Sequence, residues 1–234
     1  MHLKIVCVMG SGFSGIGKGV ITASVAKSCK MRGQRVFPIK FDGYLNQNSG
    51  TMNPYHLIPE VIDEEEEVFV LKDGWEVDSD LGTYERFLDM ELTKENNPSG
   101  GDFIRKIVEI EQKHLFPIGK TLYFPHLVQI AKDWLYKASK KADVILLEIG
   151  GVITDRETDF MIEALRQLEQ DNKNSIYFIL LAGVPLFDGS RRTKPSRQAF
   201  RQLMSKGINA DTLVLRSEDQ ILRSDLKTTE FFAD

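Results

Sequence analysis

The feature that most constrains the fold is a glycine-rich segment, residues 12–19 (GFSGIGKG), set between a short apolar run and a helix-like stretch. Consecutive backbone N–H groups in such a turn, at the N-terminus of a helix, form a pocket for a polyphosphate, and Lys18 adds a mobile positive charge. The spacing matches a phosphate-binding loop up to the lysine, but Gly19 stands where that motif places the Ser or Thr that contacts magnesium. The sequence therefore predicts that carboxylates further along the chain hold the metal ion.

Strand and helix patterns alternate around this loop. An apolar run, a helical periodicity and a second apolar run follow one another at residues 3–9, 18–31 and 35–40. A strand–helix–strand unit of this kind favours parallel pairing with a right-handed crossover. The alternation resumes later, with strands expected at 142–149, 175–182 and 211–216 and helices at 158–170 and 195–206. We therefore expect an α/β fold with a doubly wound, mostly parallel sheet and helices on both faces.

The bulk composition is that of an ordinary globular protein. With 234 residues, 42% hydrophobic and 27% charged, the chain is expected to form a single domain over residues 1–234. Between residues 41 and 141 the pattern is less regular, with helices expected near 103–112 and 125–140. A net charge of −4, no run of membrane-spanning length and no signal-peptide pattern predict a cytoplasmic protein that binds neither nucleic acid nor membrane.

Three informative segments fall at the carboxyl ends of predicted strands, where open α/β sheets bind ligands: the glycine loop, residues 40–42 and residues 148–151. Glu148 is placed to meet a metal ion held by phosphates, although the glycines beside it could instead mark a turn. The stretch 76–80 offers three acids at alternate positions, which would share one side if the chain were extended, although surface loops are commonly acidic.

A second cluster is basic. Residues 191–197 (RRTKPSR) place four positive side chains just before a helix whose first turn tolerates proline. An exposed basic turn would explain this segment taken alone, but beside a loop for one polyphosphate it indicates a second phosphorylated substrate. Two anionic substrates near a divalent ion point to phosphoryl transfer, in which Lys18 and Lys40 would neutralise charge on the transferred group.

In this order the segments resemble the N-terminal synthetase (amidoligase) domain of CTP synthase, within the dethiobiotin-synthetase-like group of phosphate-loop (P-loop) NTPase-like proteins. The match runs over nearly the whole chain. Its most specific portions are residues 14–19 (SGIGKG), 40–46 (KFDGYLN), 50–54 (GTMNP), 78–87 (DSDLGTYERF), 147–151 (LEIGG), 155–157 (DRE) and 193–195 (TKP). The resemblance implies that ATP phosphorylates the 4-oxygen of the UTP uracil ring and that ammonia then displaces the phosphate to give CTP.

The resemblance also implies roles for single residues. Lys18 and Lys40 would be catalytic, and Asp78 and Glu148 would hold Mg²⁺. The ATP phosphates would be bound by Ser14, Gly15, Ile16, Gly17, Lys18 and Gly19. The pyrimidine nucleotide, UTP or CTP, would be bound by Ser14, Asp155, Glu157, Arg192, Lys194, Arg197 and Lys227.

The chain also departs from the family pattern. The family carries a glutaminase domain that makes ammonia, and none is expected within residues 1–234, so free ammonia or a separate amine supplier would provide the nitrogen. Thr83, Asp102 and Tyr123 differ from the family near the expected acceptor and the subunit contacts of a dimer or tetramer. Two alternatives stay open: a same-fold ATP-dependent ligase with a different acceptor or amine, and a non-catalytic nucleotide-binding module for regulation or assembly.

Overall fold

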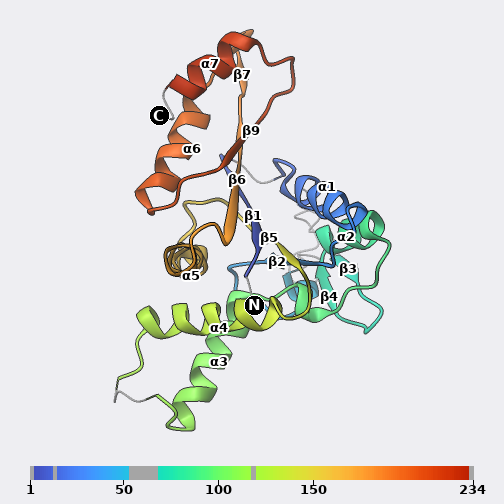
Figure 1. The fold of residues 1–234 in the computed structure, drawn as a ribbon, viewed down its shortest axis with the longest axis vertical. Coiled ribbons are helices and arrows are strands. Elements are labelled where there is room, and N and C mark those ends of the chain that lie inside the picture. Colours follow the sequence, from blue (N-terminus) through green and yellow to red (C-terminus); the bar gives the residue numbers. More distant parts are fainter. Residues whose placement is uncertain (1–2, 13–14, 53–67, 117–119, 232–234) are drawn as a thin grey trace, which may run out of the picture.

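The centre of the molecule is a five-stranded parallel sheet with strand order β2-β5-β1-β6-β9 (Figure 1). The computed structural model describes residues 3–12, 15–52, 68–116 and 120–231. The strands of the sheet are β1 (Ile5–Ser11), β2 (Val36–Phe41), β5 (Val144–Ile149), β6 (Ile176–Gly183) and β9 (Thr212–Arg216). The parallel sheet that the sequence predicts is therefore confirmed.

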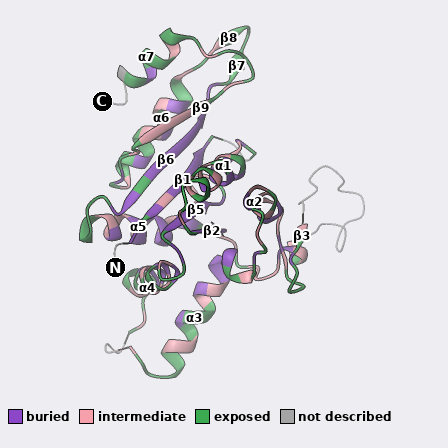
Figure 2. Ribbon diagram, turned by 45° about the vertical axis from the view of Figure 1, so that its right-hand side comes forward, coloured by how far each residue is buried: buried purple, intermediate pink, exposed green. Residues whose placement is uncertain are grey.

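Helices pack on both faces of this sheet (Figure 2). One face is covered by α1 (Lys18–Met31) and α2 (Asp80–Leu88), whose buried side chains pack with Val144 and Leu146 of β5. The opposite face is covered by α3 (Gly100–Gln112), α4 (Val128–Ala138), α5 (Asp159–Asp171) and α6 (Lys194–Ser205). This is the doubly wound arrangement expected from the alternating pattern.

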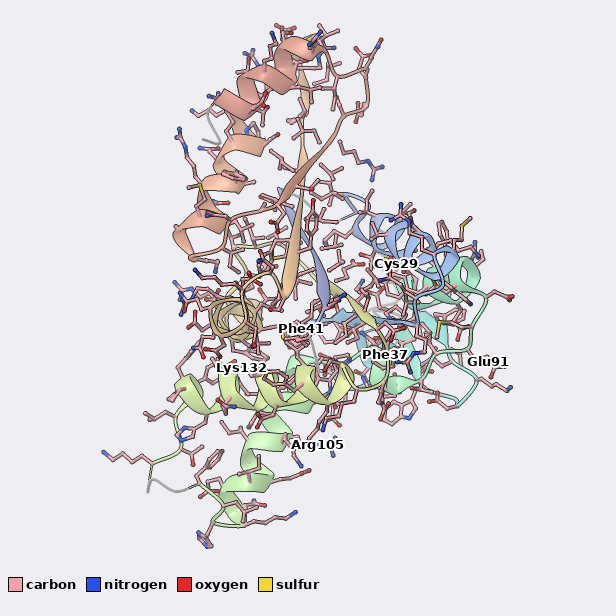
Figure 3. All side chains as sticks on the ribbon, in the orientation of Figure 1. Cys29, Phe37, Phe41, Glu91, Arg105 and Lys132 are labelled. Atoms are coloured by element: carbon pink, nitrogen blue, oxygen red, sulfur yellow. The ribbon has the colours of Figure 1, made fainter. Side chains whose placement is uncertain are left out.

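The larger core cluster gathers around Phe41 at the end of β2, which Figure 3 labels near the middle of the molecule. Its ring lies edge-on to Phe103 of α3 and Phe160 of α5, with ring centroids 5.8 and 5.4 Å apart. Edge-to-face pairs of this kind add directional packing to the burial of large apolar surface. The carboxyl end of β2 is therefore fixed from the face opposite to α1 and α2.

Several elements were not predicted from the sequence. The stretch 41–141 contains, besides the two expected helices, the antiparallel hairpin β3 (Val68–Val70) and β4 (Glu76–Asp78), which leads directly into α2. A second hairpin joins β7 (Leu186–Phe187) to β8 (Ser190–Arg191), and the last helix is α7 (Arg223–Phe231). Short helical turns are η1 (Ser49–Met52), η3 (Lys94–Asn96), η4 (Tyr123–Leu127) and η5 (Arg156–Thr158). No helix in the described ranges is long and apolar enough to cross a membrane.

Candidate active site

The glycine loop connects the carboxyl end of β1 to the first turn of α1. Gly12, Gly15 and Gly17 have φ values of 102°, 72° and 98°, a region that residues with a Cβ rarely adopt, so these glycines permit the tight turn. Gly10 is needed for a different reason: a Cβ there would lie 2.8 Å from Cδ of Lys18. The Lys18 side chain therefore lies over the end of β1, and its Nζ donates a hydrogen bond to the Gly151 carbonyl oxygen at 2.8 Å.

Lys40 and Glu148 stand next to each other at the ends of β2 and β5, because the parallel register pairs their Cα atoms. Side chains two residues apart along a strand share a face, so Glu148 points to the same face as Val144 and Leu146, the face covered by α1 and α2. Lys40 and Glu148 are both buried, with 7% and 1% of their surface exposed. Lys18, Lys40 and Glu148 thus lie together at the edge of the sheet where the predicted strands end.

Lys40 is held by carboxylates from the last residue of β4 and the first residue of α2. Its Nζ forms ion pairs with Oδ2 of Asp78 at 2.8 Å and with Oδ2 of Asp80 at 2.5 Å. Burial opposes the charged form of Lys40, but attraction from Asp42, Glu148, Asp78 and Asp80 outweighs it and keeps the Lys40 pKa well above its ordinary value. Lys40 is therefore a permanent positive charge under the phosphate loop.

Asp80 explains why Gly19 replaces the usual Ser or Thr. A Cβ at Gly19 would collide with the Asp80 carboxylate, so a larger residue at this position would displace the acid. The space that a hydroxyl side chain would fill beside the first turn of α1 thus holds the carboxylate of Asp80 instead. Sequence reasoning named Asp78 for the metal. In the structure both Asp78 and Asp80 pair with Lys40, and Asp80 is the acid that also lies against the phosphate loop.

The three acids at 76–80 do not lie on one extended strand as the alternate spacing suggested. Only Glu76 and Asp78 belong to β4, and Asp80 is the first residue of α2. The backbone N–H of Asp80 donates a hydrogen bond to Oδ1 of Asp78 at 2.8 Å, which fixes the turn between the two elements. The change from strand to helix directs Asp80 toward Gly19, so the helix start rather than the strand alternation sets its direction.

Glu148 has an unusual environment for a carboxylate. Its Oε2 accepts a hydrogen bond from the hydroxyl of Tyr84, which is fully buried on α2. Burial raises the pKa of Glu148 to about 7, with Asp80 adding to the rise and Lys40, the Tyr84 hydrogen bond and Lys18 opposing it. In the ligand-free protein the Glu148 carboxyl therefore gains and loses its proton near neutral pH.

The pKa of Lys18 is lowered, first by burial and then by the positive charge of Lys40, against attraction from Glu148, Asp80 and Asp42. An added anion near Lys18 would favour its charged form. Because β1 and β2 both flank β5, their ends place the two lysines on either side of Glu148. Two buried lysines, Lys18 and Lys40, thus lie with carboxylates beside a glycine loop. This arrangement is suited to binding a polyphosphate together with a divalent ion.

The Gly150–Gly151 turn after Glu148 connects this cluster to Asp155 and Glu157. Oδ2 of Asp155 accepts the backbone N–H of Val152 at 2.8 Å, and Gly151, with φ of 67°, leaves room for that carboxylate. Glu157 packs close to Gly43, because a Cβ added at Gly43 would lie only 2.7 Å from the Cβ of Glu157. Both acids therefore lie in the loop beyond the strand ends, and Lys18 touches the start of this loop through the Gly151 carbonyl.

The basic segment lies elsewhere, with the β7–β8 hairpin, α6 and α7 in the upper part of Figure 1. Arg191, one of the four cations of that segment, is neutralised by two acids from further along the chain, because its Nε lies 2.7 Å from Oδ2 of Asp225 on α7 and its Nη1 3.3 Å from Oδ2 of Asp219. Arg192 lies over the Phe187 ring with its guanidinium carbon 6.0 Å from the ring centroid. Lys194 and Lys227 are exposed and Arg197 is half-buried. Among the residues that the structure describes, no ion pair joins this segment to the lysine–carboxylate cluster, so its role as a second anion site stays a prediction.

Sequence reasoning also missed a groove beside the phosphate loop. It has a volume of about 620 Å³, and its lining includes Ile16, Gly17 and Val20 on one side and Leu215 and Arg216 on the other. Nη1 of Arg216 donates a hydrogen bond to the Gly15 carbonyl at 3.0 Å, so the arginine at the end of β9 reaches across to the loop. An arginine at the carboxyl end of the last strand is the signal that could have indicated this groove.

Two departures from the family pattern have structural explanations. Oδ2 of Asp102 accepts the backbone N–H of Ser99 at 3.0 Å in a capping box that starts α3, and Asp102 also lies 3.6 Å from Nζ of Lys94. Tyr123 lies close enough to Glu157 for the acid to contribute to the rise in the tyrosine's pKa, after burial. Thr83 lies on α2 between Asp80 and Tyr84 and is half-buried. Ser14, predicted to bind both nucleotides, lies outside the described residues.

The donor set fits a magnesium ion bound together with nucleotide phosphates. Within the described ranges, no group of three or more His, Cys, Asp or Glu side chains forms a metal cage. Magnesium in nucleotide-binding sites is commonly held by one or two carboxylates plus phosphate oxygens and waters, so a complete protein cage is not required. Asp80, in the space beside Gly19, and Glu148, at the end of β5, supply two such carboxylates next to the loop.

A parallel α/β sheet with a lysine-bearing glycine loop between its central strand and first helix defines a phosphate-loop NTPase-like domain. The chain belongs to the family described as CTP synthase N-terminus, whose family model matches residues 4–233. A CTP synthase from Pyrobaculum aerophilum is 40% identical over 233 residues, which are 98% of this chain and 42% of that protein. A CTP synthase from Thermococcus kodakarensis is 36% identical over 234 residues, 99% of this chain and 42% of that protein. The chain thus spans less than half the length of these relatives.

Two solved structures align with nearly the whole chain. The signal recognition particle receptor FtsY from Elizabethkingia anophelis aligns over 99% of this chain and 56% of its own, with a TM-score of 0.44 and 12% identity. FlhF complexed with GMPPNP and Mg²⁺ aligns over 100% of this chain and 63% of its own, with a TM-score of 0.44 and 13% identity.

Proposed function

We propose that this domain catalyses the synthetase half of the CTP synthase reaction: ATP phosphorylates the 4-oxygen of the UTP uracil ring, and ammonia then replaces it to give CTP. The observation that carries the proposal is the convergence of Lys18, Lys40, Asp80 and Glu148 at one edge of the sheet, beside the glycine loop. Membership of the CTP synthase N-terminus family supports the choice of substrates.

In this proposal the residues act mainly by positioning charge. The loop N–H groups and Lys18 bind the ATP phosphates, and the groove lined by Ile16, Val20 and Arg216 receives the nucleoside. Lys40, held by Asp78 and Asp80, faces the transferred phosphoryl group and balances the charge that develops on its oxygens. Asp80 and Glu148 would hold magnesium, which when bound draws the phosphate oxygens together and offsets their charge.

The proposed chemistry has two steps. First, the bond between the β–γ bridging oxygen and the γ-phosphorus of ATP breaks and a bond from that phosphorus to the uracil 4-oxygen forms, releasing ADP, while ring nitrogen 3 loses its proton and forms a double bond to carbon 4. Ammonia then attacks carbon 4 through its lone pair, the carbon–oxygen bond breaks with inorganic phosphate as leaving group, and the nitrogen loses a proton. Phosphorylation is needed because an unmodified carbonyl oxygen is a poor leaving group.

The pyrimidine nucleotide would lie toward the loop 150–157, with Asp155 and Glu157 near the base. Its triphosphate would be bound by Arg192, Lys194, Arg197 and Lys227. These cations lie directly after β8, on α6 and on α7, so we also propose a homo-oligomer, a dimer or tetramer, in which substrate sites are completed between copies. The nitrogen would come from free ammonia or from a separate amine supplier.

The test incubates the purified protein with ATP, Mg²⁺, UTP and an ammonium salt and measures CTP and ADP by chromatography. CTP formation in equal amounts with ADP is expected, and it should disappear when either UTP or ammonium is left out. ADP release without CTP would assign a different acceptor. Nucleotide binding without any turnover would assign a non-catalytic module, and either result would reject the proposed reaction.

A further inference from the structure

Tyr84 lies next to the candidate active site and is buried, but the proposed reaction assigns it no role. It lies on α2, and no part of its side chain reaches solvent. A buried aromatic ring packs equally well without a hydroxyl, whereas a buried hydroxyl is tolerated only where it finds a partner. The partner is Glu148, whose Oε2 accepts the hydrogen bond from Tyr84.

We propose that Tyr84 is a positioning residue that fixes the Glu148 carboxylate so that its second oxygen, Oε1, is directed at the divalent ion of the bound ATP. This inference rests on the proposed function, because it requires Glu148 to meet that ion. A glutamate at a strand end has three rotatable side-chain bonds, so an unrestrained carboxylate could adopt several orientations. A hydrogen bond to one oxygen removes most of them and leaves the other oxygen free to bind a cation.

The cations of the site do not provide this restraint. Lys18 and Lys40 attract Glu148 electrostatically, but among the described residues neither forms an ion pair with it within 4.0 Å. Lys18 donates instead to the Gly151 carbonyl, and Lys40 pairs with Asp78 and Asp80. Electrostatic attraction across more than 4.0 Å favours the charged form of Glu148, but it does not fix the direction of the carboxylate oxygens. The orientation is therefore left to Tyr84.

One helix face sets both carboxylates. Asp80 and Tyr84 are four residues apart on α2, so their side chains lie on the same face of the helix. Asp80 extends to Lys40 and Gly19, while Tyr84 extends to Glu148 one turn further along. Thr22 of α1 lies beside the Tyr84 hydroxyl, and its own hydroxyl donates a hydrogen bond to the Lys18 carbonyl oxygen at 2.9 Å. This face of α2 is therefore packed against the first turn of α1. A single rigid element thus supplies one proposed metal ligand and orients the other.

The test measures metal binding without turnover. The protein is saturated with the non-hydrolysable analogue AMP-PNP and titrated with Mn²⁺, and free Mn²⁺ is followed by electron paramagnetic resonance. Tyr84→Phe keeps the ring and removes the hydroxyl, and we expect it to raise the Mn²⁺ dissociation constant about tenfold, the lower end of the effect of losing an outer-shell partner. Affinity for metal-free AMP-PNP should not change, because the loop and Lys18 are intact.

The matched control is Tyr177→Phe. The Tyr177 hydroxyl also bonds one side chain, Thr212 at 2.6 Å, but it lies near the amino end of β6, away from the strand ends that form the site. Its removal should leave Mn²⁺ affinity unchanged. In a Glu148→Gln background, adding Tyr84→Phe should have no further effect on Mn²⁺ binding, since the ligand that Tyr84 orients has already been changed.

Three results would overturn the inference: unchanged Mn²⁺ affinity in folded Tyr84→Phe, an equal loss in Tyr177→Phe, or additive losses in the Glu148→Gln background. Should the parent protein with AMP-PNP bind no Mn²⁺ at all, the proposed function itself would fail, and this result is distinct from the other three. If Tyr84→Phe does not fold, 3-fluorotyrosine at position 84 serves instead. Its ¹⁹F resonance should shift when Mg²⁺ is added to the AMP-PNP complex, and an unmoved resonance would reject the proposal.

Discussion

Lys40 at the end of β2 and Asp80 at the start of α2 form an ion pair, with Nζ and Oδ2 2.5 Å apart. The pair joins the central sheet to a helix that follows a hairpin remote in sequence. The same carboxylate fills the space beside Gly19 of the phosphate loop. A single acid thus connects two parts of the site, and the sequence motif of the loop does not contain it.

Removing Lys40 should destabilise the protein. Lys40→Met would leave Asp42, Asp78, Asp80 and Glu148 close together without their buried counter-charge, and we expect the free energy of unfolding to fall by about 3 kcal/mol. Urea unfolding at neutral pH followed by circular dichroism measures this. Lys173→Met is the control, because Lys173 is exposed after α5 and its loss should change stability by less than about 0.5 kcal/mol. Equal stability of the two variants would contradict the charge balance described for this site.

Lys18→Ala should abolish most nucleotide turnover while the fold is retained. Loss of one preorganised positive donor at a transferring phosphoryl group is expected to lower kcat about 10²- to 10³-fold. ADP release under saturating ATP, Mg²⁺ and acceptor is the measurement. Lys27→Ala, on the same helix and only half-buried, provides the comparison. Turnover at the parental rate in Lys18→Ala would mean that the phosphate loop had been assigned to the wrong role.

A Cβ at position 19 should be tolerated only when the acid beside it is removed. Gly19→Ala would force the Asp80 carboxylate away from the loop, and overpacking of this kind costs about 1–3 kcal/mol. Asp80→Ala should recover a large part of that loss in the double variant, which a double-mutant cycle of urea unfolding would measure as a coupling energy. Strictly additive effects of the two substitutions would show that Gly19 and Asp80 are not in contact.

The stability of the metal-free and nucleotide-free protein should fall as pH rises from about 4.5 to about 7, because burial raises the pKa of Glu148 from 4.5 to about 7. In this window the unfolded chain has already released the proton while the folded protein still holds it, so folding becomes less favourable as pH increases. The contribution of Glu148 is about 3 kcal/mol across the window and constant above it.

Glu148→Gln isolates this contribution, since the amide keeps the shape and cannot ionise. The difference in unfolding free energy between parent and variant, measured at several pH values, should decrease through the window and level off above pH about 7. Asp42, whose pKa is also raised by burial, remains in both proteins and cancels from the difference. A pH-independent difference would place the Glu148 pKa at its ordinary value.

Asp155→Ala should change which pyrimidine nucleotide binds more than it changes ATP binding. The variant removes a carboxylate proposed to lie near the base, and it also frees the Val152 N–H that Asp155 accepts. Asp155→Asn keeps an acceptor for that N–H while removing the charge, so it separates loop geometry from base recognition. Calorimetric titration with UTP and CTP should show a changed ratio of affinities in both variants, and an unchanged ratio would remove Asp155 from the pyrimidine site.

Much of the fold follows from local patterns. The first helix was predicted at residues 18–31 and is α1, and the five strands of the sheet lie within two residues of their predicted bounds. Buried parallel strands form continuous apolar runs, which are readable without knowledge of their neighbours. The hairpin of β3 and β4 was missed because each strand has three residues, too few for a periodic pattern.

The sequence by itself determined the parallel sheet, the phosphate loop and the meeting of Lys40 with Glu148, because the carboxyl ends of parallel strands meet at one edge whatever the loops between them do. Only the tertiary structure decided that Asp80 lies against the loop, that Tyr84 bonds Glu148 and that Arg216 closes a groove. These contacts join residues that are far apart in the sequence, from Gly19 and Asp80 to Gly15 and Arg216, which are 201 positions apart, and the direction of Asp80 also depends on where a strand changes into a helix. Such long-range packing leaves no local periodicity in the sequence from which it could be predicted.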